Sequence, residues 1–123
     1  LNPKISTIYY SRGNSKMALK DFEGAISDFD KAIEIDSNYK SAYVNRGISK
    51  KNIKDFKGSI IDYEKVLSMN PNDAITFHNL ALSKKELGDI KGACEDMKKS
   101  FSLGNPLASK FINIECKVKT KAT

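Results

Sequence analysis

The chain has 123 residues, of which 40% are hydrophobic and 29% charged, and this balance fits one folded domain better than a disordered chain. Its apolar runs end after a few residues, far short of the ~20 needed to cross a bilayer, so we expect no membrane insertion. The net charge is +6, but only two of the cations are arginines, the residue best suited to binding phosphates and bases.

Three copies of a 34-residue repeat follow one another without a gap and occupy residues 6–39, 40–73 and 74–107. The first and second copies share 13 residues, and the second and third share 10. Within each copy the apolar residues recur every three or four positions, which is the spacing of one helical face. Each copy is therefore predicted to form two helices.

An aspartate is predicted to cap the second helix of each copy, because its carboxylate can accept backbone amides of the first helical turn. The three caps are Asp21, Asp55 and Asp89. The residue before each cap lies in a tight turn that favours glycine, and a positive φ there would strain a lysine. These turn residues are Lys20, Lys54 and Gly88.

Both ends of the chain lie outside the three copies. Apolar residues between Leu107 and Cys116 predict a seventh, capping helix over residues 108–117, and residues 118–123 form a basic tail. At the other end, Leu1-Asn2-Pro3 occupies the same slots as Met69-Asn70-Pro71, the close of a repeat. We therefore interpret residues 1–5 as the end of a preceding repeat and the chain as a fragment of a longer array.

This pattern resembles the tetratricopeptide repeat (TPR). In the second copy the characteristic slots hold Tyr43, Gly47, Ser59, Tyr63 and Pro71. The resemblance implies an all-α fold, a right-handed α-α superhelix (TPR solenoid) of three helix-turn-helix repeats and a seventh capping helix. The sequence departs from the family where a tyrosine is usual, at the eleventh slot, which holds Lys16, Lys50 and Lys84.

The resemblance also implies that the first helices line a concave groove. Asparagine amides in such a groove can read a peptide backbone, and lysines there offer charge to an acidic partner. We expect a non-catalytic scaffold that binds an extended or helical peptide of a partner protein. The candidate groove residues are Tyr10, Asn14, Met17, Val44, Asn45, Ile48, Lys51, His78, Asn79, Leu82 and Lys85.

One branch of the family clamps the C-terminal carboxylates of heat-shock chaperones with two asparagines and three basic residues. Asn14 and Asn45 match the two asparagines, but the basic positions hold Tyr10, Ile75 and Asn79. Because the positive charge is missing, we expect no chaperone-tail clamp.

Cys94 and Cys116 lie 11 residues on either side of Asn105, the centre of the turn between two antiparallel helices. The two thiols should therefore sit at the same height, either as a disulfide or as two buried, reduced cysteines. A disulfide would favour an oxidising compartment such as a bacterial periplasm over the cytoplasm.

Nothing in the sequence indicates catalysis. His78 is the only histidine and has no nucleophile or orienting acid placed near it by spacing. Two cysteines and one histidine fall short of a four-ligand zinc site, and no glycine loop suits a nucleotide. We expect neither enzyme activity nor a cofactor nor a metal.

Two other functions stay open. One is structural self-assembly, in which the apolar N-terminal face around Ile5, Ile8 and Tyr9 stacks on a preceding repeat or on another copy of the chain. Residues 74–123 carry nine lysines against five acidic residues, which would allow electrostatic binding of nucleic acid, although we expect a protein or peptide partner.

Overall fold

The computed structural model describes residues 3–117, and over this range it consists of helices joined by short turns. The predicted all-α fold is thus confirmed for the described residues. Six helices of 13 to 16 residues are followed by a short seventh helix that leads into a π-helical turn, η1. The bounds are α1 Pro3–Ala18, α2 Phe22–Ile35, α3 Lys40–Asn52, α4 Phe56–Met69, α5 Ala74–Glu86, α6 Ile90–Ser102, α7 Ala108–Phe111 and η1 Ile112–Cys116.

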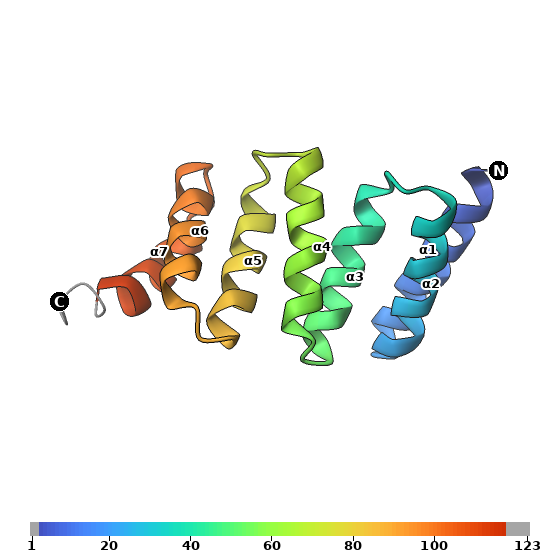
Figure 1. The fold of residues 1–123 in the computed structure, drawn as a ribbon, viewed down its shortest axis with the longest axis horizontal. Coiled ribbons are helices and arrows are strands. Elements are labelled where there is room, and N and C mark those ends of the chain that lie inside the picture. Colours follow the sequence, from blue (N-terminus) through green and yellow to red (C-terminus); the bar gives the residue numbers. More distant parts are fainter. Residues whose placement is uncertain (1–2, 118–123) are drawn as a thin grey trace. The chain divides into compact units, whose positions relative to one another are not determined.

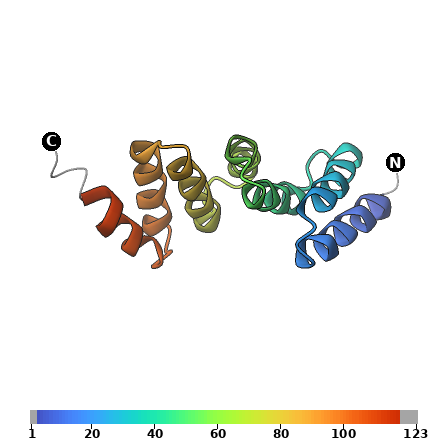
Figure 2. The same cartoon turned by 90° about the horizontal axis from the view of Figure 1, so that it is seen from below.

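The chain divides into two compact units, residues 1–66 and 67–123, with the boundary in the last turn of α4. In the first unit α2 packs against both α1 and α3 (Figures 1 and 2). In the second unit α5 packs against α6, and α6 contacts both α7 and η1. The third repeat and the capping segment, which we define as α7 and η1 (residues 108–116), therefore share one unit.

Close contact between the paired helices explains the glycine in each of the first two repeats. A Cβ atom on Gly13 would lie 2.6 Å from Phe29 Cε1, and one on Gly47 would lie 2.7 Å from Tyr63 Cε1. Both rings are buried, and they fill the space that a side chain would need. In the third repeat Ala81 replaces the glycine and Met97 replaces the aromatic residue, and both lie in one buried cluster. The larger residue at the first slot is thus matched by a slimmer side chain at the second.

An aspartate on the second helix of each repeat, buried in the first two repeats and half-buried in the third, pairs with cations on the first helix. In the first repeat Asp28 accepts two hydrogen bonds from Arg12, at 2.6 and 2.9 Å, and lies 3.2 Å from Lys16 Nζ. The hydrogen bond from Arg12 holds the pKa of Asp28 below its usual value, against the opposing effect of burial. The second and third repeats repeat this arrangement in the pairs Arg46–Asp62, Lys50–Asp62 and Lys84–Asp96.

These pairs account for the lysine at the eleventh slot, where the family usually has a tyrosine. Each of the three lysines reaches the aspartate of its own repeat across the helix pair, at 3.2, 3.4 and 2.6 Å in chain order. The departure from the family pattern is therefore a repeated ion pair, not an irregularity of packing.

The predicted helix caps and turns are confirmed. Asp21, Asp55 and Asp89 each accept a hydrogen bond from the backbone N–H three residues later, at 2.9 to 3.0 Å. The residue before each cap has a positive φ, which strains a side chain but not a glycine. The angles are 64° at Lys20, 66° at Lys54 and 85° at Gly88.

Both ends of the described range are helical. Helix α1 begins at Pro3, a residue type that suits a first helical turn because it lacks an N–H, so residues 3–5 are helical. The assignment of residues 1–5 to the end of a preceding repeat stays a prediction. The capping segment occupies residues 108–116, close to the predicted span. Leu1, Asn2 and the basic tail 118–123 lie outside the described residues.

Candidate functional site

An asparagine pair joins the first helices of the first unit. The side-chain amide of Asn45 on α3 donates one hydrogen bond to Asn14 Oδ1 at 2.7 Å and another to the Tyr10 hydroxyl at 3.2 Å. All three side chains are partly exposed. The two donors of Asn45 are thereby used within the chain.

The asparagine pair leaves some of its hydrogen-bonding groups free for a ligand. Each side-chain amide has two N–H donors and one carbonyl acceptor. Among residues 3–117, neither Asn14 Nδ2 nor Asn45 Oδ1 makes a hydrogen bond of its own. The pair therefore presents donors on Asn14 and an acceptor on Asn45, which is the complement of a peptide unit.

Other predicted groove residues of the first unit serve the core as well as the surface. The ring of Tyr10 packs at a tilt against Phe29 and Tyr39, with ring centroids 5.9 and 4.8 Å apart, and Met17 packs against the same cluster. On α3, the side chains that remain partly exposed along one face are Val44, Ile48 and Lys51.

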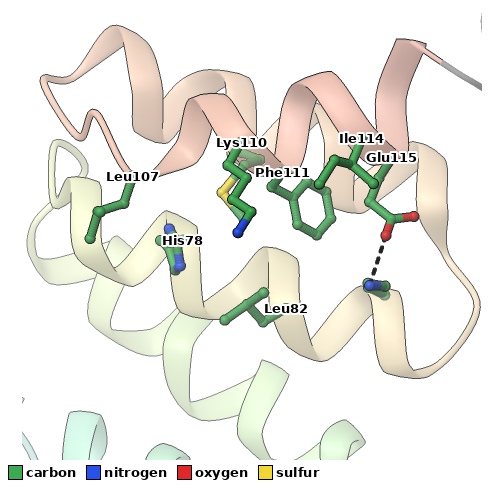
Figure 3. Close-up of a pocket in the computed structure, with 9 residues that line it drawn as sticks. His78, Leu82, Leu107, Lys110, Phe111, Ile114 and Glu115 are labelled. Carbon is green, nitrogen blue, oxygen red and sulfur yellow. Dashed lines mark ion pairs between the residues drawn. The ribbon is translucent and has the colours of Figure 1, made fainter.

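A cavity of about 260 Å³ lies in the second unit between α5 and the capping segment. On the α5 side it is lined by His78, Leu82 and Lys85, three of the predicted groove residues (Figure 3). Met97 of α6 also lines it. The opposite wall is formed by Leu107, Lys110, Phe111, Ile114 and Glu115.

Of the two lysines at this cavity, one forms an ion pair with a described residue and the other does not. Lys85 Nζ lies 2.9 Å from Glu115 Oε1 and 5.7 Å from the centre of the Phe111 ring. Lys110 has no ion pair within the described part of the chain, and Figure 3 shows its side chain extending from α7 toward α5. The cavity therefore carries one cation that no carboxylate compensates.

A buried asparagine in the turn before α7 fixes the histidine of α5. Asn105 Nδ2 lies 3.0 Å from His78 Nδ1 and also donates to Ser100 Oγ at 2.9 Å. Ser100 in turn donates to the carbonyl of Ala74 at 2.7 Å. Because Asn105 Nδ2 can only donate, His78 Nδ1 is the acceptor of this hydrogen bond.

A disulfide connects the capping segment to the third repeat. Cys94 on α6 and Cys116 in η1 are bonded, with their Cα atoms 5.8 Å apart. The bond therefore anchors the end of the segment that contributes Ile114 and Glu115 to the cavity wall.

Sequence reasoning found the α5 side of this cavity but missed its other wall. The apolar residues between Leu107 and Cys116 predicted a capping helix, and none of them was predicted to bind a ligand. The available signal was Ile114, an apolar residue that does not share the helical face of Ala108, Ile112 and Cys116. In the structure Ile114 is 53% exposed. Asn79 has no hydrogen bond within the described range, so its predicted role stays a prediction.

Two features are absent from the described residues. No three His, Cys, Asp or Glu side chains in residues 3–117 are grouped closely enough to bind a metal ion. None of the helices in that range has the length and apolar character that a bilayer crossing requires.

Comparison with known proteins gives the following matches. Two models described as tetratricopeptide repeat match residues 6–39 and 41–73, which together are more than half of the chain. No curated protein sequence matches the chain significantly.

Several solved structures share the fold. The first TPR of Spaghetti (RPAP3) bound to HSP90 peptide SRMEEVD is 15% identical with a TM-score of 0.89, covering 98% of this chain and 97% of its own. The Arabidopsis OM64 TPR domain is 19% identical with a TM-score of 0.84, covering 92% and 98%. The Sgt2 TPR domain from Aspergillus fumigatus is 21% identical with a TM-score of 0.84, covering 95% and 80%. At these identities the similarity establishes a helical-repeat fold.

Proposed function

Because the chain belongs to the tetratricopeptide repeat family, we propose that it is a non-catalytic interaction scaffold that holds a segment of a partner protein along its first helices. The segment is extended or helical, and it lies on partly exposed faces such as those of α1 and α3.

The Asn14–Asn45 pair is the observation that supports this proposal most directly. Its unused donors and acceptor are held in place by the 2.7 Å bond between the two amides, so they need no ordering when a peptide arrives. Val44 and Ile48 lie on the same helix as Asn45 and offer apolar contact beside it. A backbone-reading amide with apolar neighbours suits an extended peptide.

The expected segment is not a chaperone tail. The TPR domain solved with an HSP90 peptide belongs to a different protein, which is 15% identical to this chain. In this chain the first basic position of such a clamp is Tyr10, whose ring packs on Phe29 and Tyr39 and whose hydroxyl is bound by Asn45. A terminal carboxylate would find no cation there.

A peptide array tests the proposal. We would probe an array of random peptides with the parent chain and with Asn14→Ala, Asn45→Ala and Asn38→Ala. Asn38 is a matched control, since it is exposed in the turn after α2 and its side chain makes no hydrogen bond with residues 3–117. We expect peptides that the parent and Asn38→Ala bind alike and that the two groove variants bind about tenfold more weakly. An array that the parent does not bind, or that all four bind equally, would contradict the proposal.

A second candidate is self-association through the N-terminal face of α1. Ile5 is 42% exposed and Ile8 is 64% exposed, on a helix that carries no acidic residue in its first turn. Sedimentation at increasing concentration tests this role. A parent that grows in mass while Ile8→Ser stays monomeric supports it, and a parent that stays monomeric throughout rejects it.

A further inference from the structure

The cavity between α5 and the capping segment has the size of a side-chain pocket. Its volume of about 260 Å³ lies below the ~300–1,000 Å³ that is typical of small-molecule and cofactor sites. It is closed on the α5 side by Leu82 and on the capping side by Phe111 and Ile114 (Figure 3). Leu82 and Phe111 are half-buried, and Ile114 is exposed, so an apolar group can reach all three from solvent.

The charges around this apolar surface determine what its occupant carries. The Lys85–Glu115 pair at 2.9 Å is internally neutral and closes one end of the cavity. Lys110 extends across the cavity and has no carboxylate partner within residues 3–117. An occupant with a carboxylate beside its apolar group would pair with Lys110, whereas a basic occupant would be repelled.

We propose that this cavity binds a leucine-sized aliphatic side chain that is flanked by carboxylates in a partner peptide. The aliphatic group lies on Leu82, Phe111 and Ile114, and a neighbouring carboxylate pairs with Lys110. This inference rests on the interaction role proposed above and adds the chemistry of the segment that the second unit selects.

The site is built from two segments of the chain, α5 and the capping segment. Two of its apolar walls and its unpaired cation come from residues 110–114, whereas α5 supplies Leu82. The Cys94–Cys116 disulfide fixes the end of that segment on α6, and Asn105 fixes His78 on the α5 side. The walls are thus anchored before a ligand binds, which lowers the entropic cost of binding.

The test is an NMR titration of the oxidised, full chain with matched peptides. The probes are acetyl-Gly-Glu-Leu-Glu-Gly-amide, the same peptide with alanine in place of leucine, and the same peptide with lysines in place of both glutamates. We expect saturable shifts of the Leu82 and Ile114 methyl signals with the first peptide, binding about tenfold weaker with the second, and no saturable shift with the third. Equal shifts with the leucine and alanine peptides would overturn the apolar half of the proposal and thereby the proposal itself.

Two substitutions at exposed positions separate charge from apolar contact. Lys110→Gln should weaken the first peptide about threefold to fivefold, and Ile114→Ser should weaken it by a similar factor. The matched controls are Lys98→Gln on α6, which removes the same charge outside this cavity, and Ile61→Ser on α4, where the isoleucine is 65% exposed. If the control variants lose as much affinity for the first peptide as the site variants do, the proposal is overturned.

The outcomes distinguish this inference from the broader proposed function. If the array shows binding that depends on Asn14 and Asn45 while the leucine peptide leaves Leu82 and Ile114 unshifted, this inference fails and the interaction role stands. If single-stranded dT10 shifts the same methyl signals and competes with the peptide at equal charge, the site is a general anion site and the inference fails. Array peptides that the parent and all three asparagine variants bind equally, together with saturable shifts at Leu82, would reject the Asn14–Asn45 site while keeping this cavity.

Discussion

Arg46 Nη1 donates a hydrogen bond to Asp30 Oδ1 at 2.8 Å, which joins the first helix of the second repeat to the second helix of the first. The same guanidinium binds Asp62 within its own repeat, at 2.7 and 3.0 Å. Arg46 thus contacts two repeats with one side chain. In the third repeat the equivalent position holds Leu80, so only Lys84 pairs with Asp96 there.

The two partners of Arg46 should differ in their contribution to stability. Asp30 is 55% exposed, so Asp30→Asn should lower the free energy of unfolding by less than about 1 kcal/mol. Asp62 is 1% exposed and pairs with both Arg46 and Lys50, so Asp62→Asn removes a buried charge from two ion pairs and should cost about 3 kcal/mol. Urea denaturation measures both, with Glu64→Gln, an exposed residue of α4, as the control. Equal losses from the two aspartate variants would show that burial does not set the strength of these pairs.

The pair of Asp28 with Arg12 predicts a pH dependence in the acid range. Because the pKa of Asp28 is lowered in the folded chain, the folded state binds fewer protons than the unfolded state just below pH 4. The stability that this carboxylate contributes is therefore complete above its unfolded pKa and is lost as the pH falls through its folded pKa. We expect Asp28→Asn to cost about 2 kcal/mol at pH 7 and progressively less below about pH 4, measured by urea denaturation across pH. A constant difference from the parent down to pH 2 would contradict this assignment.

The Gly47–Tyr63 contact predicts a non-additive pair of substitutions. Gly47→Ala alone should lower the free energy of unfolding by about 1–3 kcal/mol, because its Cβ would meet the Tyr63 ring, even though alanine is the better helix former. Adding Tyr63→Met recreates the Ala81–Met97 combination of the third repeat and should restore part of that loss. A double-mutant cycle measures the coupling, which we expect to reach about 1–2 kcal/mol. Additive effects would mean that the two side chains do not compete for the same space.

Features that depend on the 34-residue period could be predicted from the sequence. The cap aspartates, the positive φ at Lys20 and Lys54, and the helix pairs follow from local patterns that occur three times, so each copy checks the others. The role of Lys16 was missed because its partner, Asp28, lies on the other helix of the pair and the sequence gives no pairing between them.

The candidate site was predicted less completely, and the reasons are physical. The sequence made Asn45 a candidate groove residue but could not show that its donors bind Tyr10 and Asn14, because hydrogen bonds between repeats depend on the packing of α1 against α3. The cavity of the second unit combines α5 with a segment that lies outside the repeat, so no period relates Leu82 to Ile114.

The strained lysines predict a stabilising substitution. Lys54 has a φ of 66°, while the equivalent turn residue of the third repeat is Gly88 with a φ of 85°. Lys54→Gly should raise the free energy of unfolding by about 0.5–1 kcal/mol, since glycine adopts this conformation without a steric penalty. Urea denaturation measures the change, and Lys57→Gly within α4 is the control, which should be destabilising because it lies inside a helix. A loss of stability in Lys54→Gly would show that the lysine side chain contributes more than its backbone strain costs.

The Cys94–Cys116 disulfide predicts that reduction loosens the second unit only. The bond spans 22 residues, and closing a loop of that length in the unfolded chain contributes about 3 kcal/mol. All five tyrosines lie in residues 1–66, so their fluorescence reports the first unit, while amide hydrogen exchange on α6 and the capping segment reports the second. With a phosphine reductant we expect exchange on α6 and η1 to accelerate by about two orders of magnitude while the tyrosine transition in urea stays unchanged. The Cys94→Ala/Cys116→Ala variant should exchange at the reduced rate with or without reductant. Unchanged exchange in the reduced parent would show that packing alone holds the capping segment on α6.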